Sequence, residues 1–204
     1  MPWQAKPLPY KSLNGLSERQ IAEHYKLYEG YVKKFNEIET KLNNVNWSDA
    51  NSTYSEVREL KIEESFALNA IKLHEGYFFS FGGNGQPSGN AVKLIEMDYG
   101  SIDGWKNQMF AEGVAARGWV VCAYDWSRAC VENFVCDAHN LYNIWNATPL
   151  VILDVYEHAY FADYGTSRKE YISAWWNNLN WDIIGSVVAE SEMISHRERG
   201  RKAA

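Results

Sequence analysis

Histidines in apolar surroundings and one aspartate are the residues of this chain most suited to chemistry. An apolar run of four residues ends on Asp154, and His158 follows four positions later, so the two side chains can converge if the chain turns into a helix there. His24 and His74 lie in two other apolar segments. A buried carboxylate is costly unless it is paired or binds a metal. Three imidazoles and one carboxylate are suitable ligands for a metal of intermediate hardness, such as iron or manganese.

These residues also permit a purely structural interpretation. Each histidine could be a hydrogen-bonded residue of the core. A histidine four positions after an aspartate can form a structural salt bridge. Spacing alone does not bring positions 24, 74 and 154 together, so the pattern predicts a metal site without excluding core packing.

Helical periodicity marks two long segments in the first half of the chain. From Leu16 to about Leu42 the apolar residues fall on one face together with His24, and Ser17 begins a capping box at the start. A second periodic segment covers about residues 55–81, after an Asn-rich break. Two long antiparallel helices are the simplest arrangement.

The second half of the chain combines helices with strands. A Gly- and Pro-containing loop at residues 82–90 precedes two shorter helical segments up to residue 115. Residues 118–154 contain three short runs rich in β-branched and aromatic residues, which predict strands, and residues 166–194 return to helical periodicity. Segregated helices and strands indicate the α+β class. We expect an N-terminal helical-hairpin domain at 1–84 and a C-terminal domain with a three-stranded antiparallel sheet and helices at 85–204.

Composition excludes several classes of function. The chain has 204 residues, of which 46% are hydrophobic and 23% charged, and its net charge of −6 contains no long like-charge block, so nucleic acid is not an expected partner. The start lacks a secretory signal and no 18-residue apolar span occurs, which predicts a soluble, cytoplasmic protein without a membrane partner. Cys122, Cys130 and Cys136 fit no zinc pattern and are expected to be free thiols. The basic end at 196–204 is expected to be a solvated tail.

The segment around the aspartate resembles the signature of the iron/manganese superoxide dismutases. Residues 154–160, "DVYEHAY", are similar to the family's Asp-x-Trp-Glu-His-Ala-Tyr motif. Further matches occur in the same order over nearly the whole chain: "LPYKSL", "YVKKFN", Gly118-Trp119 and "ATPLVILDV". The resemblance implies disproportionation of superoxide by one iron or manganese ion, bound by His24, His74, Asp154, His158 and a solvent molecule.

The resemblance also implies roles for residues around the metal. His139 would donate to the metal-bound solvent and tune its potential, which fits the presence of Ala70 where some iron-type members carry Gln. This donor favours iron, or tolerance of either metal. Tyr31 resembles the gateway tyrosine of the substrate funnel, and Arg168 the arginine that attracts the anion.

An oligomer and an aromatic shell complete what the resemblance implies. Glu157 is similar to the glutamate that reaches the partner's metal-ligand histidine, so a homodimer or homotetramer is expected. Aromatic residues should keep the site dry and rigid. The expected shell consists of Tyr77, Phe78, Trp119, Trp126 and Trp176.

The chain departs from the family at four points near this site. His24 and Tyr31 are seven residues apart where most members have eight, although seven also keeps both on one helix face. Tyr28 or Leu27 is nearest to the place of a family histidine, and Phe161 replaces its partner tyrosine, which predicts that a hydrogen bond between funnel and interface is lost. Tyr156 replaces the signature tryptophan. At this position we expect the wall of the site to leave more space or to admit water.

Two other functions compete with a dismutase. A non-catalytic relative could keep the fold and the metal, and the altered first helix supports that alternative. A non-haem iron oxygenase would normally use two histidines and one carboxylate. Three histidines with one aspartate favour the dismutase.

Overall fold

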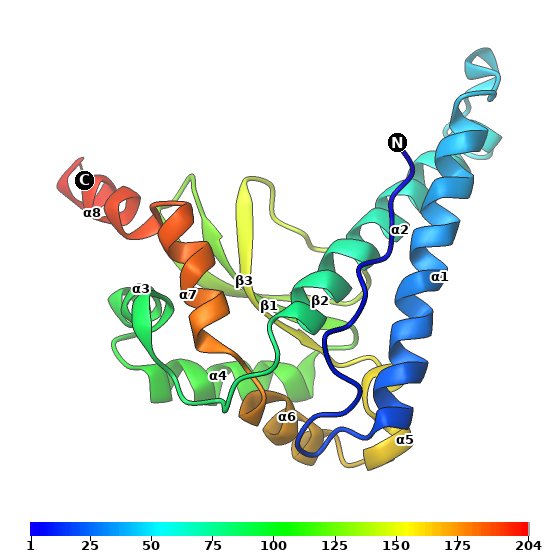
Figure 1. The fold of residues 1–204 in the computed structure, drawn as a ribbon. Coiled ribbons are helices and arrows are strands. Elements are labelled where there is room, and N and C mark those ends of the chain that lie inside the picture. Colours follow the sequence, from blue (N-terminus) through cyan, green and yellow to red (C-terminus); the bar gives the residue numbers. More distant parts are fainter. Residues whose placement is uncertain (204) are drawn as a thin grey trace.

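A hairpin of two long helices forms the N-terminal part of the computed structural model, which describes residues 1–203 and the side chains as far as residue 200. The first residues run along this hairpin, which projects from the rest of the molecule (Figure 1). Helix α1 covers Glu18–Leu42 and α2 covers Glu56–Phe79, with the short 3-10 helix η1, Trp47–Asp49, between them. Ser17 and Ser55 cap the two helices by accepting from the backbone N–H three residues on. The two predicted long helices are therefore confirmed.

The second half contains the remaining helices and all three strands of the sheet. The predicted short helices and strands are present within a few residues of their expected limits. In chain order these elements are α3 Gly89–Tyr99, α4 Ile102–Ala115, β1 Trp119–Asp125, β2 Cys130–Cys136, β3 Ala147–Asp154, η2 Glu157–Ala159, α5 Phe161–Tyr164, α6 Arg168–Asn177, α7 Trp181–Glu190 and α8 Met193–Ala203.

The sheet is antiparallel with the strand order β2-β1-β3. The central strand β1 is buried along its whole length, in agreement with its run of β-branched and aromatic residues. Trp119, the first residue of β1, pairs with Asp154, the last residue of β3. This register places Trp119 and Asp154 at the same end of the sheet, and the predicted α+β class is confirmed.

The sheet lies between the hairpin and the C-terminal helices (Figure 1). Helix α2 packs against β3, whereas α3, α4 and α7 contact β2, β1 and β3 respectively. A Cβ added at Gly76 of α2 would lie 2.3 Å from Ile152 Cδ1, so glycine permits the close approach of α2 to β3. The division into domains at 1–84 and 85–204 stays a prediction.

The basic end of the chain is not the solvated tail that we expected. His196 on α8 hydrogen-bonds through Nδ1 to the Tyr124 hydroxyl at 2.8 Å, and Arg197 forms an ion pair with Asp98 in which both side chains are largely buried. Apolar packing of Met193, at the start of α8, brings these residues onto the core. The side chains beyond residue 200 and all of residue 204 lie outside the described residues.

The cysteines behave as small apolar residues of the sheet. Cys122 and Cys136 are buried, Cys130 is partly buried, and all three are free thiols, as expected. Burial raises the pKa of the Cys136 thiol to about 11, so it stays protonated at neutral pH. Among the described residues, no helix is both long and apolar enough to cross a membrane.

Two glycine-to-alanine substitutions should change stability in opposite directions. A Cβ at Gly83 would lie 2.2 Å from the backbone oxygen of Leu179, and backbone cannot move aside cheaply, so Gly83→Ala should destabilise by about 1–3 kcal/mol. At Gly30 in α1 a Cβ meets nothing within 4 Å, so Gly30→Ala should stabilise by up to about 1 kcal/mol through helix propensity. Denaturant unfolding measures both. Equal effects of the two variants would contradict the packing described at Gly83.

Candidate metal centre

Four side chains from separate parts of the chain converge beside the end of β3. His24 comes from α1, His74 from α2, Asp154 from the last position of β3, and His158 from η2. Each offers one ligand atom, and these four atoms lie within 4.8 Å of one another. The Oδ2 atom of Asp154 is 3.0 Å from Nε2 of His24, 3.2 Å from that of His158 and 3.8 Å from that of His74. The fold thus brings these four residues together, which their spacing in the sequence alone could not show.

His74 shows that this cluster fits a cation. Its Nδ1–H donates to the backbone oxygen of Ala70 at 2.7 Å, which fixes the tautomer and leaves the lone pair on Nε2. That Nε2 is buried and has no hydrogen-bond partner within the described part of the chain. An unsatisfied buried acceptor is costly in a native protein, whereas a metal ion among these atoms would satisfy it.

The protonation states also suit a metal. Burial lowers the pKa of His74 to about 3 and, despite the opposing effect of Asp154, lowers that of His24 as well, so both imidazoles are neutral near pH 7. Burial of Asp154 acts to raise its pKa, but the charge and hydrogen bond of His158 and those of His24 outweigh it and keep the pKa below its usual value. Neutral imidazoles and an ionised carboxylate are the forms that bind metals.

Hydrogen bonds from other elements orient Asp154. The Tyr156 N–H donates to Oδ1 at 3.0 Å, which leaves Oδ2 directed at the histidines. The Tyr171 hydroxyl donates to the backbone oxygen of Asp154 at 2.6 Å and lies 3.1 Å from the Tyr77 hydroxyl. Trp175 Nε1–H donates to the Ile152 oxygen at 3.1 Å. Sequence reasoning missed Tyr171 and Trp175, because nothing in a helical apolar run shows which backbone oxygen its polar atoms reach.

Gln20 connects α1, the helix that carries His24, to the turn that carries His158. It lies one turn before His24 on α1 and is almost completely buried. Its side-chain Nε2–H donates to the His158 oxygen at 2.6 Å, and its Oε1 accepts from the Ala162 N–H at 3.0 Å. The predicted capping box is therefore only half correct: Ser17 caps α1, but the Gln20 side chain holds the turn that carries His158.

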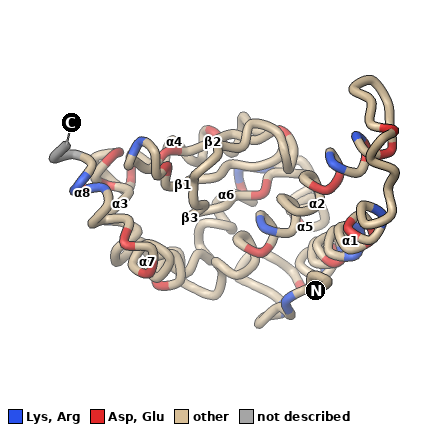
Figure 2. The backbone as a smooth tube through the Cα atoms, turned by 90° about the horizontal axis from the view of Figure 1, so that it is seen from above, with Lys and Arg blue, Asp and Glu red and all other residues tan. Residues whose placement is uncertain are grey.

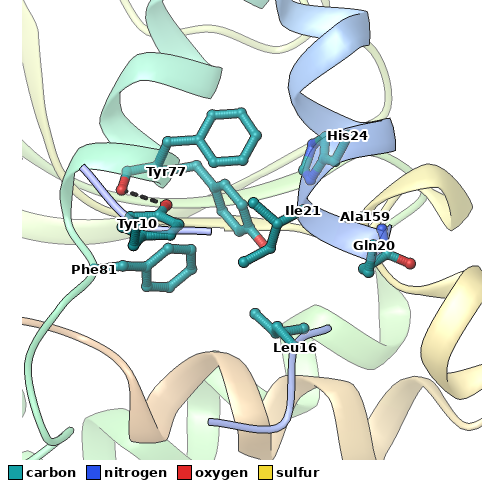
Figure 3. Close-up of a pocket in the computed structure, with 9 residues that line it drawn as sticks. Tyr10, Leu16, Gln20, Ile21, His24, Tyr77, Phe81 and Ala159 are labelled. Carbon is teal, nitrogen blue, oxygen red and sulfur yellow. Dashed lines mark hydrogen bonds between the residues drawn. The ribbon is translucent and has the colours of Figure 1, made fainter. Parts of the chain in front are cut away.

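A small cavity borders His24 on the side lined by Gln20, Ile21 and Tyr77. Figure 3 shows His24, Gln20 and Ile21 from α1 opposite Tyr77 and Phe81. Its volume of about 10 Å³ is that of one water molecule at most. Next to it the Tyr10 hydroxyl donates to the Phe78 oxygen at 2.8 Å and ties the N-terminal segment to α2. The centre is therefore closely packed on this side.

His139 and Tyr31 form a hydrogen-bonded pair beside His74. The Trp119 indole N–H donates to Nδ1 of His139 at 3.0 Å. Burial lowers the pKa of His139 to about 4, so the neutral ring carries its proton on Nε2, which donates to the Tyr31 hydroxyl oxygen at 3.0 Å. The rings of Tyr31 and His139 lie 5.5 Å and 5.9 Å from that of His74. Seven-residue spacing on a continuous α1 thus keeps Tyr31 at the centre.

Tyr156 fills the wall that we expected to be enlarged or rewetted. Its ring stacks on His158, with centroids 5.2 Å apart and planes at 15°, and contacts His139 at the same centroid distance. The hydroxyl donates to the Asp137 oxygen at 3.3 Å. A tyrosine here therefore covers the outer edge of the cluster and reaches across to the segment before His139.

An open cavity of about 400 Å³ leads from the surface to His158 and includes Arg168 and Glu157 in its wall. Arg168 donates through its guanidinium to the Ala116 oxygen at 2.7 Å and through Nε–H to the Tyr160 hydroxyl at 3.1 Å. Glu157 is exposed. These contacts fix the guanidinium of Arg168 at the mouth of the cavity.

The aromatic shell differs from the expected one in two members. Tyr77, Phe78 and Trp119 contact the ligand histidines, as predicted. Trp126 instead packs on Tyr124 and His196 because it follows the far end of β1, about 20 Å along the strand from Trp119. Trp176 packs on Trp105 and Trp181, since its neighbour Trp175 occupies the face of α6 that meets β3. Trp126 and Trp176 were therefore wrongly assigned.

Comparison with known proteins identifies the family. Residues 87–187 match the model of the C-terminal domain of iron/manganese superoxide dismutases. The chain is 44% identical over 181 residues to "Superoxide dismutase [Fe]" of Aquifex aeolicus, with 85% of this chain and 84% of that protein covered. It is 36% identical to "Superoxide dismutase [Fe]" of Cupriavidus metallidurans (89% and 93% covered) and 30% identical to "Superoxide dismutase [Mn] 2" of Haloferax volcanii (89% and 93% covered). The chain belongs to the iron/manganese superoxide dismutase family.

The buried neutral histidines predict acid sensitivity of the metal-free protein. The pKa values of His74 and His139 are about 3 and about 4 in the folded state, against about 6.5 when unfolded. Between these values the unfolded chain binds more protons, so the free energy of unfolding should fall as pH drops below about 6.5, by up to about 1.4 kcal/mol per pH unit for each such histidine. Urea unfolding from pH 7 to pH 4.5 measures the slope.

The control for this prediction is His139→Gln, which removes one titrating group and should make the slope shallower. A stability that stays constant over the interval, or a slope that His139→Gln leaves unchanged, would contradict the assignment of neutral histidines.

Proposed function

We infer that this protein is a superoxide dismutase, which converts superoxide to dioxygen and hydrogen peroxide with one iron or manganese ion. The observation that carries the inference is the buried, unpartnered Nε2 of His74, which faces the Asp154 carboxylate together with two further imidazoles. Identity of 44% over most of the chain to two relatives with the same activity in their names supports it.

We propose His24, His74, Asp154 and His158 as the metal ligands. A bound iron or manganese ion would supply the one-electron redox chemistry by alternating between two oxidation states. One carboxylate among three neutral imidazoles leaves a bound divalent or trivalent ion with a modest net positive charge, which favours the approach of an anion. The Tyr156 N–H holds the carboxylate of Asp154, and the Tyr171 hydroxyl holds its backbone oxygen, so the ligand keeps one orientation in both states.

His139 and Tyr31 are proposed to hold the proton that must accompany each electron. Nε2–H of His139 donates to the Tyr31 oxygen, so the hydroxyl hydrogen of Tyr31 is directed elsewhere and can be donated toward the centre. Burial raises the pKa of Tyr31, which therefore keeps its proton at neutral pH. Trp119 fixes this arrangement because its indole N–H occupies the other nitrogen of His139.

Arg168 is proposed to draw superoxide to the centre. The chain carries a net charge of −6, and acidic and basic side chains are interspersed along the helices (Figure 2). A fixed cation at the mouth of the cavity beside His158 offsets this unfavourable field locally. The backbone oxygens of the segment before β1 hold the guanidinium without neutralising its charge.

We further propose a homodimer or homotetramer in which Glu157 meets His158 of a second copy. Glu157 is exposed and adjacent in sequence to that ligand. A carboxylate hydrogen-bonded to the free nitrogen of a ligating imidazole raises the basicity of the ligand. The cytoplasmic location and the preference for iron, or for either metal, remain expectations, and both metals occur in the names of the relatives.

The alternatives to a dismutase receive less support. A non-catalytic relative was suggested by the altered first helix, yet α1 is continuous and both His24 and Tyr31 contact the ring of His74. An oxygenase would normally have two histidines and one carboxylate, whereas this cluster has a third histidine.

Elemental analysis and a superoxide-disproportionation assay on the same sample test the proposed function. The wild-type protein should contain about one iron or manganese per chain and be active. His74→Ala should lose most of the metal and at least about 100-fold of the activity, because one of four ligands is removed. The control is His196→Ala, which removes a histidine bound to Tyr124 and should retain both. Metal at full content without activity would instead favour the non-catalytic relative.

A further inference from the structure

Arg117, two residues before β1, adds a second cation to the cavity that leads to His158. The charged residues that line this cavity of about 400 Å³ are Arg117, Glu157 and Arg168. The side chain of His158 is 24% exposed, whereas those of the other three proposed ligands are 2% exposed or less. The four-residue cluster is therefore most open to solvent on the side of this cavity, where Arg117 lies.

The backbone around Arg117 is held from both sides. The oxygen of Ala116 accepts from the guanidinium of Arg168 at 2.7 Å, and the oxygen of Gly118 accepts from the Val155 N–H at 2.8 Å. A Cβ added at Gly118 would lie 2.7 Å from the backbone oxygen of the last residue of β2, so this segment packs closely on the sheet. The side chain of Arg117 therefore starts from a fixed point beside the turn that follows β3.

The charge of Arg117 is only weakly offset by its neighbour. Its Nη1 lies 3.9 Å from Oδ2 of Asp137, and its side chain is 84% exposed. An exposed ion pair of this length is weak. Arg117 lines the cavity, whereas Asp137 lies outside the lining. The positive member of the pair is thus the one that an anion in the cavity meets.

The other two charged residues of the cavity offset each other. Arg168 carries a positive charge and Glu157 a negative one. In the proposed homodimer a twofold axis exchanges the Glu157 side chains of the two copies, so each cavity still contains one carboxylate. Arg117 therefore gives the lining an excess of one positive charge, and without it arginine and glutamate would balance. For an anion that approaches a chain with a net charge of −6, this excess decides whether the cavity attracts it.

We propose that Arg117 is a steering residue for the anionic substrate, because its guanidinium gives the cavity at His158 the net positive charge that Arg168 alone does not supply. This inference rests on the proposed function, since it takes superoxide as the substrate. Arg117 acts through its charge at a distance and is not a catalytic residue. It should raise both the rate of encounter with superoxide and the affinity of the site for other small monoanions.

The salt dependence of kcat/KM for superoxide, measured by pulse radiolysis on the metal-loaded protein, tests the proposal. At low ionic strength kcat/KM should fall by about threefold in Arg117→Gln and by about tenfold in Arg117→Glu. Both differences should vanish between about 0.01 M and about 1 M salt, because the Debye length falls from about 30 Å to about 3 Å. Arg117→Lys keeps the charge and should retain the wild-type values.

Two control positions separate steering from net charge and from structure. Arg58 is an exposed residue in the first turn of α2, at the far end of the hairpin (Figure 1). Arg58→Glu changes the net charge as much as Arg117→Glu and should leave kcat/KM unchanged. Asp137→Asn breaks the same ion pair as Arg117→Gln. It should raise kcat/KM at low salt, whereas a purely structural role of the pair predicts a loss in both variants.

Azide binding gives a second measurement that needs no turnover. Azide is a small monoanion, and its Kd for the metal-loaded protein can be followed by absorbance. At low ionic strength this Kd should rise by about threefold in Arg117→Gln and by about tenfold in Arg117→Glu. The Kd values of the variants and the wild type should converge at about 1 M salt.

An active wild type whose salt dependence and azide affinity are unchanged in Arg117→Glu would overturn the steering role and leave the proposed function intact. Equal losses in Arg58→Glu and Arg117→Glu, or a loss in Asp137→Asn, would overturn it as well. A wild type with full metal content and no activity would overturn the proposed function, and this inference with it.

Discussion

The ionised carboxylate of Asp154, buried completely at the end of β3, is the constraint on which the rest of this structure depends. An isolated charge at this depth would cost several kcal/mol. Three imidazoles from α1, α2 and η2 surround its Oδ2. Those of His24 and His74 are neutral, so they offset only part of that cost. A bound cation would satisfy both the carboxylate and the unpartnered Nε2 of His74. Folding and metal binding are therefore expected to be coupled.

The surrounding elements are arranged to keep these groups fixed and dry. The Tyr171 hydroxyl holds the backbone of Asp154, Gln20 ties the start of α1 to the His158 turn, and the Ala70 oxygen sets the tautomer of His74. Each contact links elements that are distant in sequence or sets the direction of a ligand atom. Trp119 and His139 then extend the arrangement to Tyr31, at the boundary between the buried centre and solvent.

Sequence patterns predicted the elements of this fold well, because the hairpin helices have strong periodicity and serine caps, and the strands have β-branched runs. The four clustered residues were found from composition around Asp154 together with the resemblance of residues 154–160 to a known motif. The roles of Gln20, Tyr171 and Trp175 could not be predicted, since their polar atoms reach backbone oxygens that only tertiary packing brings near. For the same reason Trp126 and Trp176 were misplaced: a tryptophan in an apolar run has no sequence mark that shows which layer of the core it joins.

The most direct test of this account is the thermal unfolding of protein stripped of metal, measured by calorimetry before and after addition of iron or manganese. The account predicts that the metal raises the Tm of the wild type markedly, and that Asp154→Asn, which keeps the shape of the side chain but removes its charge, loses most of this increase. Addition of metal that leaves the wild-type Tm unchanged, or that stabilises the Asp154→Asn variant equally, would contradict the central role of the buried carboxylate.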